Sequence, residues 1–538
     1  MALTNAFIAG RLEAFAALLE LAGAGPYSAW AYRRAAELVR ATPAPVAELV
    51  RAGRARELRG IGRGIEARLR ELVETGEIAE LAELERTVSP ELVGLGRYLG
   101  LGPQRAVELG RALDVRTATE LHQAATDGRL REVPGIGPKT EARIVAALAE
   151  SRPEPRRAVL LHRARALTEA VAEALGGEPA GDARRWRDRC ERLAAVVPAA
   201  RPATVLARFE ALPQIVAVVE RGTRRALGVT VDGIPLELHV PPPGAYGTAL
   251  VRATGSAEWV AGHEPLPAAA REEDVLQPWV PPELRELGAP SVKSLVEPAE
   301  IRGDLHVHTT WSDGRASVLE MGLAARARGY DYLAICDHTP NVRVVPGLDA
   351  DALRRQGEEI AAANADLAPF RLLRGTECDI RADGSLDLPD DILDELDWVQ
   401  LSLHAGQRAP RGELTRKVTE AMRHPAVRCL SHPKGRIIDH RPENALDLER
   451  VFEVALETGV ALEVNGLPDR LDLRGEHVRD AVSAGVTIVC STDAHGAERL
   501  DYMELAVHTA RRGGASAADV LNTQPLETVL EKSHFRHT

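Results

Sequence analysis

The chain is poor in aromatic residues, methionine and cysteine, and it has no long apolar run of the kind found in membrane proteins. Aromatic residues make up 4% of its 538 residues, and there are only four methionines and five cysteines. The cysteines show no Cys-x-x-Cys spacing, so we interpret them as small apolar side chains in a reducing cytoplasm. No apolar run is long enough to span a bilayer, and no signal peptide precedes the first predicted helix. The sequence therefore predicts a cytoplasmic protein without a membrane partner.

An excess of basic charge is also missing. The 79 acidic residues outnumber the 67 basic ones, which gives a net charge of −12. This balance argues against a uniformly basic nucleic-acid binder, and carboxylates that bind cations would account for part of it. A chain of this length is too long for one core and predicts three or four domains.

The most informative stretch runs from residue 301 to residue 339. An apolar run ending in Leu-His-Val-His predicts a strand that carries His306 and His308. Because residues two apart share one face of a strand, both imidazoles should point the same way. A helix is predicted over residues 320–328, and a second strand over 332–336 runs directly into Asp337-His338. Polar ligands at the carboxyl ends of successive strands are how an α/β barrel builds an active site.

The same arrangement recurs along the C-terminal half. Each time, a polar side chain stands where an apolar run gives way to a loop, at Glu377, His404, His432, Asp493 and His495. Any one of them could be an ordinary polar group at a loop entry. Together they favour a site for borderline divalent metals such as zinc, manganese or iron.

These segments resemble the motifs of the polymerase-and-histidinol-phosphatase (PHP) domain. In order, the motifs are HVHTTWSDG, ICDHT, GTECDI, SLHAG, SHPKGR and STDAHG, and the likeness runs from about residue 300 to residue 525. It is greatest to the PHP domain at the C-terminus of bacterial family X DNA polymerases. The resemblance implies a distorted, TIM-like α/β barrel with a site for three divalent metal ions (Mn²⁺, Zn²⁺ or Fe²⁺).

By that resemblance, each ion has its own ligands. The first would be held by His306, His308, Glu377 and Asp493, the second by Glu377, His404 and His432, and the third by Asp313, His338 and His495. Glu377 would bridge two ions, and we expect Glu377, Asp493 and His338 to be the most directly catalytic. Lys434 and Arg436 are candidates for contact with a substrate phosphate.

Two helix-hairpin-helix motifs are predicted near the N-terminus. LRGIGRGI carries Gly60, Gly62 and Arg63, and VPGIGPK carries Gly135, Gly137 and Lys139. A Gly-x-Gly turn at a helix N-terminus exposes backbone N–H groups that bind a phosphate without reading a base. A looser third copy is predicted over residues 94–106. These motifs indicate DNA as a partner, bound through its phosphate backbone without sequence preference.

The first 150 residues also resemble the lyase-type and fingers domains of family X polymerases. In members with deoxyribose-phosphate lyase activity, a lysine in the second helix of the first hairpin forms a Schiff base. By register, that position is Arg68 here. A guanidinium stays protonated and cannot form the imine, so this activity is not expected by that route.

The middle of the chain resembles a polymerase palm that has lost its metal ligands. Residues 181–188, GDARRWRD, are similar to the palm signature, in which a Gly-Ser and two arginines precede an Asp-x-Asp strand. The Asp-x-Asp pair aligns with Arg192 and Ala194, and a third carboxylate with Glu237. Two-metal nucleotidyl transfer needs clustered carboxylates, so nucleotide addition is not expected here.

Taken together, the resemblance predicts a multidomain α and α/β protein. Its segments are a helical lyase-like domain (1–80), a helical fingers-like domain (81–153), a degenerate α+β palm (154–262), a truncated thumb and linker (263–299) and a PHP barrel (300–530). The predicted function is that of a metal-dependent phosphoesterase acting on DNA, a 3′–5′ exonuclease or end-processing enzyme in repair. A small-molecule phosphatase of the histidinol-phosphate type and a noncatalytic DNA-binding repair factor are the alternatives, and the oligomeric state is left open.

Overall fold

A computed structural model describes residues 5–21, 26–42, 45–58, 60–87, 103–115, 118–133, 136–149, 158–212, 214–230, 233–286, 288–290, 294–342 and 345–531. The chain forms two compact units: Met1–Ala158 with Leu167–Pro179 and Glu191–Tyr246, and Val159–Ala166 with Ala180–Cys190 and Gly247–Thr538. The predicted palm is thus shared between them, and the five-segment division stays a prediction. Within the described residues, we find no helix whose length and apolar character would let it cross a membrane.

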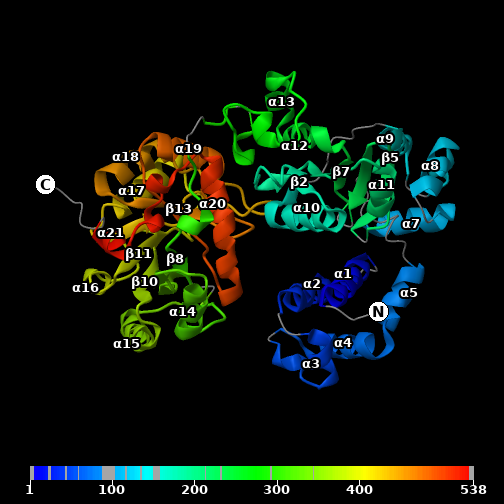
Figure 1. Ribbon diagram of the computed structural model, residues 1–538. Coiled ribbons are helices and arrows are strands. Elements are labelled where there is room, and N and C mark those ends of the chain that lie inside the picture. The colour runs from blue at the N-terminus through cyan, green and yellow to red at the C-terminus, as the bar shows by residue number, and fades with distance from the viewer. Residues whose placement is uncertain are drawn as a thin grey trace. The chain divides into compact units, whose positions relative to one another are not determined.

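The first unit begins with two groups of helices (Figure 1). The first group consists of α1 (Asn5–Leu21), α2 (Pro26–Ala41), α3 (Val46–Arg51), α4 (Arg63–Thr75) and α5 (Ala79–Thr87). The second consists of α7 (Pro103–Leu113), α8 (Ala118–Thr126) and α9 (Pro138–Ala149). Each group closes its own apolar core, around Phe15 and Leu69 in the first and around Leu130 and Ile144 in the second.

A mixed five-stranded sheet follows, as expected for a palm. Its order is β2 (Glu178–Gly181), β4 (Leu193–Val196), β7 (Pro235–His239), β6 (Arg225–Thr230) and β5 (Ile215–Arg221). β4 and β7 are parallel, whereas β7, β6 and β5 are antiparallel. α10 (Leu161–Leu175) and α11 (Pro202–Glu210) accompany the sheet, and β1 (Val159–Leu160) pairs with β3 (Arg189–Cys190).

Little regular structure separates this sheet from the barrel. α12 (Tyr246–Thr254) and α13 (Ala257–His263) are followed in the described residues only by short 3₁₀ turns until residue 300. Trp259, Val275 and Leu276 form a small apolar cluster in this stretch. It corresponds to the proline-rich segment predicted as a truncated thumb and linker.

The C-terminal part is a nearly closed barrel of seven parallel strands. In sequence order, which is also the order in the sheet, they are β8 (Gly303–Val307), β9 (Tyr332–Ile335), β10 (Arg371–Asp379), β11 (Trp398–Ser402), β12 (Val427–Leu430), β13 (Ala461–Asn465) and β14 (Ile488–Ser491). A parallel bridge between Val307 and Ala494 joins the first strand to the last. The expectation of a TIM-like barrel is therefore confirmed.

Helices connect these strands and cover the outside of the barrel (Figure 1). They are α14 (Val318–Ala327), α15 (Ala350–Leu367), α16 (Asp390–Leu393), α17 (Arg411–Ala421), α18 (Leu448–Thr458), α19 (Gly475–Ser483), α20 (Met503–Arg512) and α21 (Leu526–Glu531). α14 begins with a capping box between Ser317 and Glu320, close to its predicted start. Because all seven strands run the same way, their carboxyl ends lie on one face of the barrel.

Candidate metal centre

The nine predicted metal ligands converge at the carboxyl ends of six barrel strands. His306 and His308 come from β8 and the residue after it, Glu377 from β10, and the others from the loops that open at the strand ends. Six of the nine are buried, and Asp313, His404 and His495 are partly exposed. The structure thus brings together all nine residues that the sequence singled out.

Glu377 lies at the middle of this cluster. Its Oε1 is 2.9 Å from His432 Nε2 and 3.5 Å from His404 Nε2. Its Oε2 is 2.8 Å from His338 Nδ1 and 3.7 Å from the Nε2 atoms of both His306 and His308. Burial alone would raise the pKa of Glu377, but the surrounding imidazoles hold it well below its ordinary value. One carboxylate therefore faces five imidazoles, an arrangement suited to a bridging ligand.

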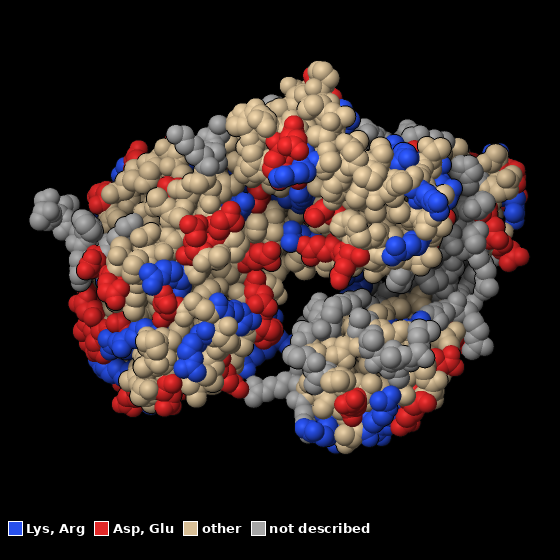
Figure 2. Space-filling model, in the orientation of Figure 1, with Lys and Arg blue, Asp and Glu red and all other residues tan. Residues whose placement is uncertain are grey.

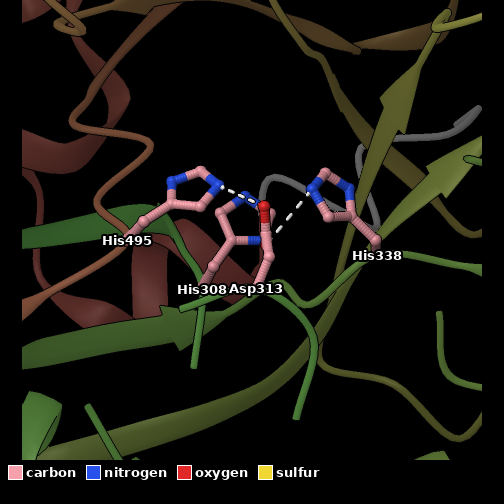
Figure 3. A group of neighbouring side chains, drawn as sticks. All are labelled: His308, Asp313, His338 and His495. Carbon is pink, nitrogen blue, oxygen red and sulfur yellow. Dashed lines mark ion pairs between the residues drawn. The ribbon is translucent and has the colours of Figure 1, made fainter. Parts of the chain in front are cut away.

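A second focus forms around Asp313 (Figure 3). Its Oδ2 is 3.1 Å from His495 Nε2, and its Oδ1 is 3.5 Å from His338 Nε2 and 4.0 Å from His308 Nδ1. The turn that carries Asp313 packs tightly on β8, because a Cβ on Gly314 would lie 2.6 Å from the His308 carbonyl. Glycine at this position therefore lets Asp313 approach the histidines.

Several ring nitrogens in the cluster are buried without a hydrogen-bond partner. They are His306 Nε2, His308 Nδ1 and His432 Nδ1; His308 Nε2 and His338 Nδ1 are also buried, but they lie 3.1 Å from Asp493 and 2.8 Å from Glu377. Burial and the charge of neighbouring His495 and His338 lower the pKa of His308 to about 4, so its ring is neutral at pH 7. A neutral imidazole is the form that binds a divalent metal, so the His308 ring, which lies between Asp313 and Asp493, fits such an ion.

The ligand atoms gather in three groups, each within 4.8 Å. The groups are His308, Asp313, His338 and His495; His306, His308 and Asp493; and His338, Glu377 and His404. The second lacks Glu377, and the third contains His338 where the resemblance placed His432, although His432 still contacts Glu377. The number of ions and the assignment of each ligand stay predictions.

Polar residues surround the ligands, and of these Glu463 and Asp379 were missed from the sequence, whereas Asp337 was predicted beside His338. Glu463 on β13 is fully buried. It accepts a hydrogen bond from the His432 backbone N–H at 2.6 Å, and it pairs with His306 Nδ1 at 2.7 Å. Asp379 accepts from the His404 N–H at 2.9 Å, and Asp337 from the Thr309 N–H at 2.8 Å. Such partners fix the orientation of metal-binding rings. For Glu463, a charged residue within the apolar strand ALEVN was the available signal.

The phosphate contacts expected of Lys434 and Arg436 stay a prediction, and the structure pairs both side chains with protein groups. The Lys434 ammonium is buried and donates to the Leu446 carbonyl at 2.9 Å. The Arg436 guanidinium donates to Asp188 and to the carbonyls of Arg470 and Leu471. Both side chains thus tie loops together inside the protein, and all three printed bonds of Arg436 go to protein oxygens.

The described residues of the two predicted hairpins share one backbone hydrogen bond. In the first, the Ile61 N–H donates to the Leu58 carbonyl at 3.1 Å, and in the second, the Ile136 N–H donates to the Val133 carbonyl at 3.1 Å. Each turn then enters a helix, with Gly62 as the exposed N-cap residue of α4 and Gly137 next to the start of α9. Arg63 and Lys139 are exposed. Gly135 and much of the third copy lie outside the described residues.

Two further predictions concern single positions in the first unit. Arg68, at the lyase position, forms ion pairs with Glu71 and Glu80. On the palm sheet, Ala194 of β4 is paired directly with Glu237 of β7. A side-chain hydrogen bond with His239 lowers the pKa of Glu237 to about 2, and the positive charge of Arg192 also lowers this pKa.

Two family models match the N-terminal region. Residues 3–78 match the helix-hairpin-helix domain, and residues 99–150 match the SAM-like helix-hairpin-helix tandem. Each match includes one of the hairpins described above. The expectation of helix-hairpin-helix domains is confirmed.

Comparison with whole proteins extends the likeness to the full chain. It is 32% identical to the DNA polymerase/3′-5′ exonuclease PolX of Bacillus subtilis over 96% of this chain and 97% of that protein. Two proteins named "Probable phosphatase" match the C-terminal region: one from Acetivibrio thermocellus is 32% identical over 36% of this chain and 78% of its own, and one from Syntrophotalea carbinolica is 29% identical over 42% and 94%. The chain belongs to the bacterial family X DNA polymerase/3′-5′ exonuclease family, and its C-terminal barrel is that of a metal-dependent hydrolase of the PHP type.

Proposed function

We propose that the protein hydrolyses phosphoesters of DNA at the metal centre of its barrel, as a 3′–5′ exonuclease or end-processing enzyme in DNA repair. The observation that carries this proposal is the ring of imidazoles around Glu377, in which three buried ring nitrogens lack a hydrogen-bond partner. Buried polar atoms left unpaired are costly unless a ligand satisfies them. Three divalent ions, Mn²⁺, Zn²⁺ or Fe²⁺, are the proposed ligands.

When bound, such ions supply hydroxide at neutral pH and stabilise charge on phosphate oxygens. The protein's part is to hold the ligands in place. Glu463 pairs with His306 Nδ1, which leaves His306 Nε2 facing Glu377 and Asp493. Asp379 accepts a hydrogen bond from the backbone N–H of His404 and so holds the backbone at that ligand. Glu377 and Asp493 would hold the ions nearest the reacting phosphate.

The helical hairpins are proposed to hold the DNA backbone. On the face shown in Figure 2, acidic and basic side chains are interspersed. This face therefore offers DNA no broad basic surface. Backbone N–H groups at the N-termini of α4 and α9, with Arg63 and Lys139 beside them, would supply the phosphate contacts. DNA as the substrate in turn fits the cytoplasmic location predicted for a bacterial repair enzyme.

The palm is proposed to have no polymerase activity. Opposite Glu237 stands Ala194, so the neighbouring strand offers no carboxylate at that point. The two signature arginines are also occupied: Arg184 makes a bidentate pair with Glu272 (2.8 and 2.7 Å), and Arg185 Nε donates to Glu286 at 2.9 Å. Arginines neutralised by carboxylates are poor sites for a nucleotide's phosphates.

Hydrolysis of a small phosphomonoester is the second candidate, because relatives named as probable phosphatases match the barrel alone. A noncatalytic role is disfavoured by the complete set of nine ligand-type side chains. The test is to assay purified protein with Mn²⁺ on 5′-labelled single-stranded DNA, on a primed template with nucleotides, and on a phosphomonoester panel that includes histidinol phosphate. We expect 3′–5′ shortening without extension, abolished by Glu377→Gln. Turnover of monoesters alone would favour the second candidate.

A further inference from the structure

The loop after β13 brings Arg470 to the edge of the metal centre. Arg470 Nε lies 3.8 Å from Oδ2 of Asp493, and the side chain is only 16% exposed. Its Nη1 is buried and has no hydrogen-bond partner. An N–H group in this state is costly to leave unpaired, and guanidinium is well suited to bind phosphate. The side chain that faces Asp493 therefore carries one guanidinium nitrogen that no protein group satisfies.

The backbone of this loop is held by Arg436. Arg436 Nε donates to the Arg470 carbonyl at 2.7 Å, and its Nη2 donates to the Leu471 carbonyl at 2.6 Å. Leu471 has a φ of 45°, in the left-handed region that a leucine rarely adopts. A residue in this conformation persists only where its surroundings impose it, and Arg436 is part of those surroundings.

Arg436 is in turn held by Asp188, which lies outside the barrel strands. Arg436 Nη1 donates to Asp188 Oδ2 at 2.7 Å. Asp188 closes the former palm signature, in the segment 180–190 that belongs to the same compact unit as the barrel. Trp186 of this segment stacks on His508 of α20, with ring centroids 3.6 Å apart and planes within 3°. The segment is thus packed firmly against the barrel.

We propose that Arg470 binds a non-bridging oxygen of the substrate phosphate, and that Asp188 positions Arg470 through Arg436. This inference rests on the proposed phosphoesterase function and adds a phosphate-binding residue to it. It also gives the degenerate palm signature a present role, because its last residue supports the hydrolytic site. Asp188 and Arg436 are positioning residues, whereas Arg470 contacts the substrate.

The test uses the full-length protein loaded with Mn²⁺ and the small diester bis(4-nitrophenyl) phosphate, which does not need the DNA-binding hairpins. Arg470→Ala should lower kcat/KM by about 10- to 100-fold, the usual loss for a hydrogen bond to a charged group. The same variant should bind inorganic phosphate about 10-fold more weakly by calorimetry and keep its full metal content. Arg470→Lys, which keeps the charge, should recover part of both losses.

The positioning step is tested by combining substitutions. Asp188→Ala should lower kcat/KM by about 5- to 10-fold, and Asp188→Asn, which keeps an oxygen acceptor of the same size, should lose less. Adding Asp188→Ala to Arg470→Ala should cost less than a further twofold, because both act through one contact. Arg189→Ala is the matched control, because it breaks the adjacent exposed pair with Asp439 (3.0 Å) without touching Arg436.

Several outcomes would overturn the inference. Activity and phosphate binding of Arg470→Ala within twofold of wild type would exclude the phosphate contact, and loss of metal from that variant would make Arg470 a support for Asp493 instead. Independent losses from Asp188→Ala and Arg470→Ala would exclude the positioning role. If the wild type hydrolyses no phosphoester, the proposed function fails, while calorimetry with phosphate still decides whether Arg470 binds it.

Discussion

Replacement of Glu377 by glutamine is the sharpest test of the metal centre. The amide keeps the size of the side chain and removes its negative charge. In the structure, Glu377 faces five imidazoles at 2.8–3.7 Å, and these come from groups assigned to all three proposed ions. A neutral amide is a poor bridge between two cations, whose mutual repulsion the carboxylate would offset. We therefore expect the variant to lose more than one ion per chain.

Hydrolysis should fall further than for a residue that only supports a ligand. Loss of such an outer partner costs about 10- to 100-fold in metal affinity or activity, so we expect at least about 10³-fold for Glu377→Gln. Glu463→Gln is the matched control: the same substitution in the same barrel, at a buried carboxylate that pairs with His306 at 2.7 Å. It should show the smaller loss. His495→Ala, at the rim, should disturb chiefly one ion.

The assay is metal content per chain by elemental analysis, together with hydrolysis of labelled DNA. Circular dichroism should show an intact fold, because the barrel does not depend on one residue at a strand end. Full metal content with wild-type hydrolysis in Glu377→Gln would refute the trinuclear assignment. Loss of a single ion, as in His495→Ala, would refute the bridging role alone.

Three more predictions follow from other sites. The protein should not extend a primer; template-dependent incorporation that is lost in Glu237→Ala but kept in His404→Ala would contradict this. Gly62→Glu should weaken DNA binding by about 10-fold and reduce its salt dependence, because a carboxylate would repel phosphate at the N-terminus of α4, whereas Gly10→Glu, at an exposed position of α1, should change it less than twofold. Burial alone would raise the pKa of Glu283, but His508 and Arg511 lower it to about 2. The ionised carboxylate therefore stabilises the folded protein fully above about pH 4.5, and this stabilisation is lost as the pH falls toward 2. In denaturation at pH 7, Glu283→Gln should therefore cost about 2–3 kcal/mol, and this difference should shrink below pH 4; an unchanged difference would exclude the ionised carboxylate as its source.

The local sequence pattern was sufficient to predict which side chains lie at the carboxyl ends of the barrel strands. The spacing of His306 and His308 placed both rings on one face of a strand, and the polar residues that end apolar runs marked the carboxyl ends of β9, β10, β11, β12 and β14. Those features depend on strand periodicity and on the parallel direction of strands, which are properties of short segments. They were enough to predict the barrel and eight of the nine candidate ligands, whereas Asp313, in a turn after β8, was predicted from the family resemblance.

The tertiary structure decided which side chains meet. Lys434 and Arg436 look like surface cations in a loop, yet folding buries them against carbonyl groups that lie 12 to 35 residues away. Glu463 acquires its role because β13 lies beside β12 and β14, and Asp188 meets Arg436 across 248 residues of sequence. Local periodicity specifies which way a residue points along its own strand or helix. The partner that it finds depends on how distant segments pack, because a buried charge is stable only where packing supplies its counterpart.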